Sequence, residues 1–312
     1  MAFRSQLINN MGHLGEIAAL ITAMCWTVTA MAFSSASNRV GSLAVNLLRL
    51  VAGFFFLSIF CWISRGMFFP ADASGRTWFY LLFSGLVGFT FGDLCLFQAF
   101  VVIGARISML LMALSPPMAA IIGWMIMGEK MSFQGVLGML VTLAGVSLVV
   151  LKREPGKKNE KIGHKIKLSY PFWGIMLGLG GALGQGAGLV LSKFGMGNYD
   201  PFAASQIRVM AGIAGFSVVF TFWKKWREVF HAFTDKKALG QLTLGAFFGP
   251  FLGVSFSLMA VQHTNTGIAS TIMAIVPVLI IPPSILIFKE KVTLREIIGA
   301  VVAVGGVALF FL

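Results

Sequence analysis

Long apolar stretches separated by short polar segments run through the whole chain. A membrane-spanning helix needs about 20 mainly apolar residues to cross about 30 Å of hydrocarbon. The pattern therefore predicts ten spans, at 14–33, 43–63, 78–98, 105–127, 132–151, 172–193, 202–222, 240–260, 267–288 and 294–312. The longest polar interruption, 152–171, lies between the fifth and sixth spans and is typical of an exposed linker.

The two halves of the chain repeat one another. NLLRLVAG at 46–53 matches SQIRVMAG at 205–212, so that Arg49 corresponds to Arg208 at an offset of 159 residues. Further along, the offset becomes 161 residues, and Pro116 corresponds to Pro277. Small residues recur every four positions in the first span of each half, which favours close packing of helix backbones.

Five spans per repeat is an odd number, so the second copy must cross the membrane in the opposite sense to the first. We therefore predict an all-α integral membrane protein of ten transmembrane helices. They form two inverted five-helix repeats, 14–151 and 172–312, joined by the basic linker 152–171. Inverted repeats underlie many secondary transporters, whose substrates bind near the bilayer midplane between the halves.

Composition favours a membrane protein over a soluble one. Hydrophobic residues make up 57% of the chain and charged residues 11%, whereas soluble domains average about 25% charged residues. The net charge of +13 would suit nucleic-acid binding. The Lys and Arg residues lie between the apolar runs, however, where they orient a membrane protein. We therefore expect no nucleic-acid partner.

The distribution of basic residues predicts the orientation. Five Lys and Arg residues fall on the side that holds the N-terminus, seventeen fall on the other side, and two lie inside spans. Cytoplasmic segments carry the excess of Lys and Arg. We therefore expect an integral protein of the plasma (inner) membrane, with the linker 152–171 in the cytoplasm and both termini outside.

The sequence carries no signature of an enzyme or a metal site. Its three cysteines form no CxxC pair, and its four histidines have no metal-ligand spacing. The glycine-rich run 178–188 lacks the Lys-Ser/Thr of a phosphate loop and follows no strand. We therefore expect no enzymatic activity, no metal and no cofactor.

Motifs that recur in both halves resemble the EamA branch of the drug/metabolite transporter superfamily, and the resemblance covers nearly the whole chain. Each half has a Pro midway along its fourth span, an acidic–basic pair at the end of that span, and a fifth span with Gly-x6-Gly-Val. These residues are Pro116, Glu129-Lys130, Gly138 and Gly145-Val146, then Pro277, Glu290-Lys291, Gly299 and Gly306-Val307. The resemblance implies a transporter of amino acids, nucleotide-like metabolites, sugars or toxic compounds. Ten-helix members usually keep both termini in the cytoplasm, which conflicts with the charge distribution, and we follow the charge distribution.

Polar groups inside hydrocarbon are costly and usually face a cavity, so the few in the spans are candidates for substrate binding or coupling. Arg49 and Asp93 lie in the second and third spans, where they either pair with each other or contact substrate. Arg208 repeats Arg49, but Val254 stands where Asp93 would repeat. The halves are therefore chemically unequal, as a site for one asymmetric substrate requires.

Five further polar or aromatic residues in the spans are candidates. Trp26, Gln98, Gln185 and Gln206 serve either recognition or helix packing, and Gln185 is the repeat counterpart of Trp26. Glu16 lies near the start of the first span, where its position resembles that of the proton-coupling carboxylate of small multidrug transporters. The alternative for Glu16 is an interfacial carboxylate exposed to water.

Prolines predict kinks in the fourth and ninth spans. Pro116, Pro117, Pro277 and Pro282 each remove a helical hydrogen bond. The freed carbonyls are tolerated only where protein or water can satisfy them. The kinks therefore either line the cavity or bend the helices around it.

Together these features predict a secondary transporter, coupled to protons or passive, that exports a small polar or amphipathic metabolite such as an amino acid by alternating access. A lipid or lipid-linked sugar flippase is the alternative, suggested by the 30 Phe residues and the basic, aromatic segment 224–237. A non-transporting scaffold or receptor is a third hypothesis. Substrate identity, coupling ion and the choice between monomer and homodimer stay open at this point.

Overall fold

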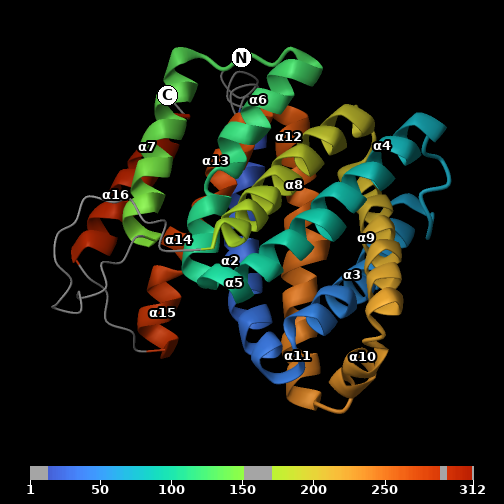
Figure 1. Cartoon of the computed structure of the whole chain (residues 1–312). Coiled ribbons are helices and arrows are strands. Elements are labelled where there is room, and N and C mark those ends of the chain that lie inside the picture. The colour runs from blue at the N-terminus through green and yellow to red at the C-terminus, as the bar shows by residue number, and fades with distance from the viewer. Residues whose placement is uncertain (1–12, 151–170, 289–293, 311–312) are drawn as a thin grey trace, which may run out of the picture.

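The computed structural model describes residues 13–150, 171–288 and 294–310, and within them every regular element is a helix (Figure 1). The first half comprises α2 (Leu14–Val40), α3 (Ser42–Arg65), α4 (Gly75–Gly85), η1 (Leu86–Gly92), α5 (Asp93–Met112), α6 (Ser115–Met127) and α7 (Phe133–Val150). The second half comprises α8 (Phe172–Met196), α9 (Pro201–Trp223), α10 (Trp226–Ala232), α11 (Lys236–Ala246), η2 (Phe247–Gly253), α12 (Val254–His263), α13 (Thr266–Met273), α14 (Val276–Leu279), α15 (Ile281–Phe288) and α16 (Leu294–Ala308). The all-α prediction is confirmed for these residues.

Within the described part of the chain, six helical segments are long and apolar enough to cross a bilayer, and they cover the first, second, third, sixth, seventh and eighth predicted spans. Shorter apolar helices at 115–127, 133–148 and 297–308 lie in the fourth, fifth and tenth predicted spans. The ninth predicted span is divided among α13, α14 and α15. The count of ten spans therefore stays a prediction.

The boundary expected between the third and fourth spans is wrong. α5 continues through 99–104 to Met112, and the break falls at 113–114, before α6. The apolar run at 99–103 holds no helix-capping residue, whereas Pro116, in the first turn of α6, has no N–H with which to continue α5. The repeat counterpart of this break is 274–275, between α13 and α14. Between the eighth and ninth predicted spans the boundary does lie where expected, at Thr264 and Asn265, whose extended backbones end α12 and begin α13.

Large apolar side chains cover much of the outer surface. Ile63 is 78% exposed, Phe222 82% and Leu286 79%. Polar side chains lie inside instead: Ser192 and Ser84 are fully buried, and their hydroxyls hydrogen-bond to each other at 3.1 Å. An apolar exterior around buried polar groups suits a protein whose outer helix faces meet lipid.

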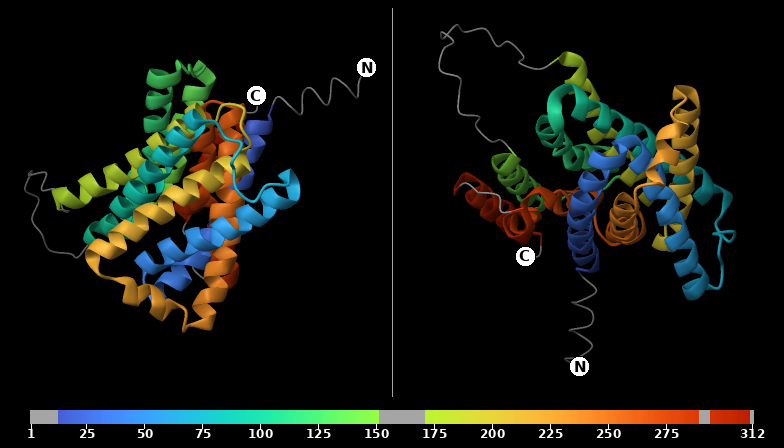
Figure 2. Two further views of the ribbon diagram at one scale, coloured as in Figure 1. Left: turned by 90° about the vertical axis from the view of Figure 1, so that its right-hand side faces the viewer. Right: turned by 90° about the horizontal axis from the view of Figure 1, so that it is seen from below.

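The corresponding helices of the two halves run in opposite directions. The start of α2 and the end of α8 lie at the same end of the molecule, because both contact Thr264. Its hydroxyl donates to Glu16 at 2.9 Å, and its carbonyl accepts from Lys193 at 2.7 Å. The second helices, α3 and α9, lie side by side (Figure 2). There the end of α3 meets the start of α9, since Arg65 donates to the hydroxyl of Tyr199 at 3.3 Å.

The first helix of each half is embedded in the other half. α2 packs against α11, η2 and α12, while α8 packs against α4, η1 and α5. Glycines bring α8 and η1 close together: a Cβ on Gly188 would lie 2.9 Å from Cα of Gly88, and one on Gly184 would lie 2.6 Å from Cα of Gly92. At the flank away from α3 and α9, α7 pairs with α16 (Figure 1). This exchange leaves the centre of the molecule bounded by helices of both halves.

Candidate functional site

Two π-helical segments face the centre of the molecule at equivalent places in the two halves. η1 covers 86–92 and η2 covers 247–253, which is the offset of 161 residues found in the sequence repeat. Gly88 and Gly92 of η1 correspond to Gly249 and Gly253 of η2. π-Helical turns are rare and often occur at functional sites, where they change the direction in which side chains project. The repeated glycines were the sequence signal for these segments, and the spans predicted from hydropathy alone do not show them.

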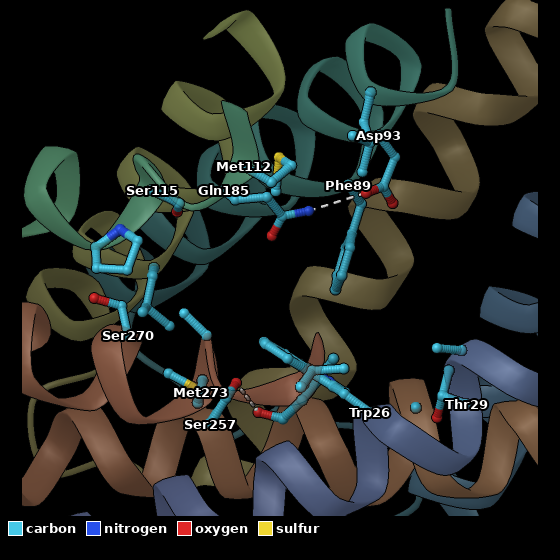
Figure 3. A pocket seen from close by; sticks show the side chains of 18 of the residues that line it. Trp26, Thr29, Phe89, Asp93, Met112, Ser115, Gln185, Ser257, Ser270 and Met273 are labelled. Atoms are coloured by element: carbon cyan, nitrogen blue, oxygen red, sulfur yellow. Dashed lines mark hydrogen bonds between the residues drawn. The ribbon is translucent and has the colours of Figure 1, made fainter. Parts of the chain in front are cut away.

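A cavity of about 340 Å³ lies between the halves beside both π-segments. Small-molecule sites are typically about 300–1,000 Å³ in volume, mainly apolar, and carry a few convergent polar groups. This lining is mainly apolar as well. Its polar side chains are Trp26, Thr29, Arg49, Asp93, Ser115, Gln185, Arg208, Ser257 and Ser270. Figure 3 shows Asp93 and Gln185 on one wall, with Trp26 and Ser257 across the cavity from them.

A hydrogen-bonded network of three side chains crosses between the halves on one wall of the cavity. Arg49 of α3 forms an ion pair with Oδ2 of Asp93, the first residue after η1. Oδ1 of Asp93 accepts a hydrogen bond from Gln185 of α8 at 2.9 Å. The Arg49 guanidinium also lies 5.6 Å from the ring centre of Phe33. Both carboxylate oxygens of Asp93 are therefore engaged, one within its own half and one by the other half.

The second arginine of the cavity has no comparable partner. Arg208 of α9 is 5% exposed, and its guanidinium lies 5.0 Å from the ring centre of Phe89 in η1. Its Nε has no hydrogen-bond partner within the described residues. At the position that repeats Asp93, the cavity is lined by Val254 instead. Two residues that are equivalent in the repeat thus have different electrostatic surroundings.

Hydroxyl groups supply the remaining polar surface, and the sequence analysis did not identify them. Thr29 donates to the carbonyl of Cys25 at 2.9 Å, Ser257 to that of Val254 at 2.7 Å, and Ser270 to that of Thr266 at 2.7 Å. Each hydroxyl thus uses its proton on the helix backbone, and its oxygen can still accept a hydrogen bond. Single Ser and Thr residues in apolar helices are too common for their sequence positions to have singled them out.

Three candidates from the sequence do not line this cavity. Gln206 is fully buried between α9 and α3 and donates to Ser58 and to the carbonyl of Phe68, each at 2.7 Å. Gln98 is exposed on α5. Glu16 is buried at the end of the molecule, where it accepts from Thr264 and lies 3.9 Å from His13. Glu16 is therefore not exposed to water, as the interfacial alternative for it requires, and it does not line the cavity either.

The prolines have different surroundings. Pro116 lines the cavity at the first turn of α6, and Pro117 follows it outside the lining. Pro282 is exposed on α15. Pro277 is the second residue of α14, but its side chain lies outside what the structure describes. Glu290 and Lys291 also fall outside the described residues.

A polar cluster joins the halves at the end of the molecule where α2 begins. Glu129, just after α6, forms an ion pair with Lys193 of α8 at 2.5 Å. Its Oε2 also accepts from the backbone N–H and the hydroxyl of Thr266 at 2.9 and 2.6 Å. These bonds hold the end of α6 against the start of α13. Glu129 is thus an inter-half contact as well as the helix-end residue that its position indicates.

A second network at the same end lies outside the predicted spans. Tyr199 donates to Oδ1 of Asp72 at 2.8 Å, and Arg65 donates to Oδ2 at 2.5 Å. Burial raises the pKa of Tyr199 to about 12, so its hydroxyl keeps the donated proton at neutral pH. Among the described residues, no three His, Cys, Asp or Glu side chains gather as a metal site would require.

Comparison with known proteins agrees with this architecture. One crystal structure, among 28 matching chains, is 16% identical and superposes with a TM-score of 0.69 over 95% of this chain and 96% of that chain. At that identity the likeness shows the fold alone. No curated protein matches the chain. The family described as the EamA-like transporter family matches residues 13–151 and 172–312, which confirms the resemblance seen in the repeated motifs. The chain therefore belongs to the EamA-like transporter family and is a membrane transporter of the drug/metabolite transporter superfamily.

Proposed function

We propose that this protein is a secondary transporter that exports a small polar or amphipathic metabolite, such as an amino acid, by alternating access through ten spans. The observation that carries the proposal is the cavity between two oppositely directed halves, with Arg49, Asp93, Gln185 and Arg208 in its lining. Buried charge is tolerated where it meets a partner or a ligand. A cavity with a few convergent polar groups, inside an apolar exterior, is what an amphipathic substrate needs on its way across a membrane.

The proposed mechanism uses the contacts between the halves. The network of Arg49, Asp93 and Gln185 has members in both halves, so substrate binding there changes the interaction between them. The cluster of Glu129, Lys193 and Thr266 joins the halves at one end, and the interrupted helices α6 and α13 lie beside it. Inverted repeats allow the two halves to exchange conformations, which would open that end and close the other.

A pH gradient distinguishes proton coupling from passive transport. Asp93 lines the cavity, and Glu16 lies at the end of the molecule where α2 begins. Because we expect Asp93→Asn to lose counterflow as well, the informative variant is Glu16→Gln. Counterflow that persists while the response of uptake to the gradient is lost would identify Glu16 as the coupled residue. Wild-type uptake that is the same with and without the pH gradient would establish passive transport.

The experiment that tests the proposal is counterflow of a broad panel of labelled metabolites in liposomes that contain the purified full chain. We expect wild type to exchange at least one class of small metabolite and Asp93→Asn to reduce that exchange at least tenfold. Asp72→Asn is the matched control, because Asp72 pairs with Arg65 outside the cavity. Equal transport by wild type and Asp93→Asn, or no exchange of any metabolite, contradicts the proposal. Metabolite levels in the medium of cells with and without the chain then give the direction.

A flippase for lipids or lipid-linked sugars is the alternative. It was suggested by the basic segment 224–237, which includes α10, and none of the residues that line the described cavity comes from that segment. Scrambling of a fluorescent phospholipid by the reconstituted protein would favour the flippase over the metabolite carrier.

A further inference from the structure

We propose that Arg208 binds the oxyanion of the transported compound and that this compound is an amphipathic organic monoanion. The inference rests on the proposed transport function and names the substrate class of the same cavity. It follows from the charges around Arg208, from what the repeat places opposite it, and from the apolar remainder of the cavity wall.

The guanidinium of Arg208 is buried in the cavity wall without an acidic partner. The side chain is 5% exposed, lines the cavity, and makes no hydrogen bond or ion pair with any described residue. The guanidinium carbon lies over the face of Phe89, 5.0 Å from the ring centre. The ring attracts the cation, but this attraction offsets only part of the cost of burying a charge without an ion-pair partner.

Asp93 attracts Arg208 electrostatically but forms no ion pair with it among the described contacts. The helices that pack most closely against α9 are α3, α4, α8, α12, η1 and η2, and none of them contains Asp or Glu. Asp93 lines the same cavity, but its two oxygens are engaged by Arg49 and Gln185. The described lining therefore holds two guanidinium groups and one carboxylate, an excess of one positive charge.

The sequence repeat explains this imbalance. Arg49 and Arg208 correspond in the two halves, and the position that corresponds to Asp93 is Val254, which lines the cavity as well. Arg49 thus has an acidic partner, Asp93, whereas Arg208 has the isopropyl side chain of Val254 at the corresponding position. A buried positive charge retained beside a cavity without its partner suits a ligand that supplies the negative charge.

The rest of the lining indicates what else the ligand carries. Apolar side chains supply much of the cavity wall on both sides: Leu96, Met112, Leu189, Met273 and Val276, together with Trp26. One singly charged oxyanion neutralises the cavity, and its apolar body can contact this wall. A zwitterion has no net charge, so it leaves the excess positive charge of the cavity in place. We therefore expect a monoanion to bind more tightly than the zwitterion or the cation with the same carbon skeleton.

The test compares such compounds on the purified full chain in dodecyl maltoside, a detergent without phosphate. The probes are 2-hydroxy-4-methylpentanoate, leucine and leucinol, which carry a negative charge, both charges and a positive charge at neutral pH. Isopentyl sulfate, which carries one negative charge at neutral pH, forms a fourth arm and distinguishes a carboxylate from a sulfate ester. We expect at least one anion to bind at least tenfold more tightly than leucine, measured by calorimetry, and leucinol to bind most weakly.

Variants assign the effect to Arg208. Arg208→Gln should weaken binding of the preferred anion at least tenfold and remove the preference over leucine, whereas Arg208→Lys should retain part of it. Val254→Asp should weaken anion binding as well, because it supplies the missing carboxylate. The matched control is Arg76→Gln, since Arg76 lies 5.0 Å from the ring centre of Phe194 and does not line the cavity.

A stability measurement separates a ligand-binding role from a structural one. Without ligand, Arg208→Gln should unfold at the same temperature as wild type or higher, because the substitution removes an unpaired buried charge. Anion binding that is unchanged in Arg208→Gln overturns the inference, as does a wild type that binds neither anion or binds leucine equally well. If the anion binds through Arg208 but liposomes do not exchange it, the assignment of Arg208 stands and the proposed transport function fails.

Discussion

At the scale of single residues, the repeat supplies equivalent positions and the neighbours decide the chemistry of each. Arg49 and Arg208 occupy matching positions, yet one has an ion pair with Asp93 and the other lies over Phe89. The sequence analysis left open whether Arg49 and Asp93 pair or contact substrate. They pair, and both also line the cavity. The two readings are therefore compatible.

The ion pair predicts a large effect for removal of one partner and a small effect for removal of both. Asp93→Asn should lower the free energy of unfolding by about 3–5 kcal/mol, because it leaves the partly buried Arg49 without its partner. The double variant Arg49→Gln/Asp93→Asn should recover most of that loss but remain inactive in transport. Titration with SDS in mixed micelles measures the free energy of unfolding. Additive losses in the double variant would show that the two side chains do not interact.

At the scale of helices, glycine spacing and helix ends set the geometry. The close crossing of α8 over η1 depends on the absence of side chains at Gly88 and Gly188. Small residues at regular spacing in the first span of the second half predicted a close packing face there. They could not indicate that the partner would be a π-segment of the other half, because such a contact depends on the tertiary arrangement.

Gly188→Ala should separate α8 from η1 and lower the unfolding temperature by several degrees. The added Cβ would lie 2.9 Å from Cα and 3.1 Å from N of Gly88, and backbone atoms cannot rotate away. Gly240→Ala in α11 is the matched control, because a Cβ there meets nothing within 4 Å. It should stabilise the helix by up to about 1 kcal/mol through helix propensity. Equal effects of the two substitutions would contradict the packing role of Gly188.

The start of α11 predicts a pH-dependent contribution to stability. Asp235 caps the helix by accepting from the N–H groups of Lys237 and Ala238, and it accepts from Arg39 at 2.7 Å. The hydrogen bond from Arg39 above all, then that from the N–H of Ala238, holds the pKa of Asp235 below its ordinary value.

A lowered pKa in the folded state means that the ionised form stabilises the fold above the ordinary pKa of about 3.9. This stabilisation is lost as the pH falls through the lowered value. Asp235→Ala should therefore unfold at a lower temperature than wild type at pH 7, and the difference should shrink below about pH 4. Thermal unfolding of both proteins across this pH range is the measurement. A difference that persists unchanged in acid would assign the effect to packing instead of charge.

At the scale of the whole molecule, opposite orientation of the halves was predicted from the odd number of spans, and the described helices run in opposite directions. The side of the membrane on which each terminus lies is predicted from the distribution of Lys and Arg. The basic residues favour an outside location for both termini, whereas the family resemblance favours the cytoplasm.

Reporter fusions decide the orientation. Alkaline phosphatase fused after Leu312 should be active in bacterial cells, and green fluorescent protein fused there should be dark, because we expect that end outside. Fusions within the linker at 158 should give the reverse pattern and serve as the control. A fluorescent C-terminal fusion would place the C-terminus in the cytoplasm, as in most ten-helix family members, and would contradict the orientation predicted from the charge distribution.

The sequence by itself determined what depends on composition and on local pattern. Apolar stretches of sufficient length indicated helices in a membrane, the repeated motifs indicated two related halves, and the scarcity of charge in the spans singled out Arg49, Asp93 and Arg208. These properties can be identified in the sequence without knowing which helices are in contact. The repeat of Arg49 at Arg208 and its failure at Val254 were visible in the same way.

Only the tertiary structure decided the contacts between segments distant in the chain. It joined Gln185 to Asp93 and Glu129 to Lys193, and it removed Gln98, Gln206 and Glu16 from the lining of the cavity. It also placed the break before α6 and the π-segments beside the cavity. The physical reason is that a side chain's direction depends on the local turn of its helix, and its partner depends on which half packs against that turn. A short stretch of sequence specifies neither the direction of the side chain nor its partner.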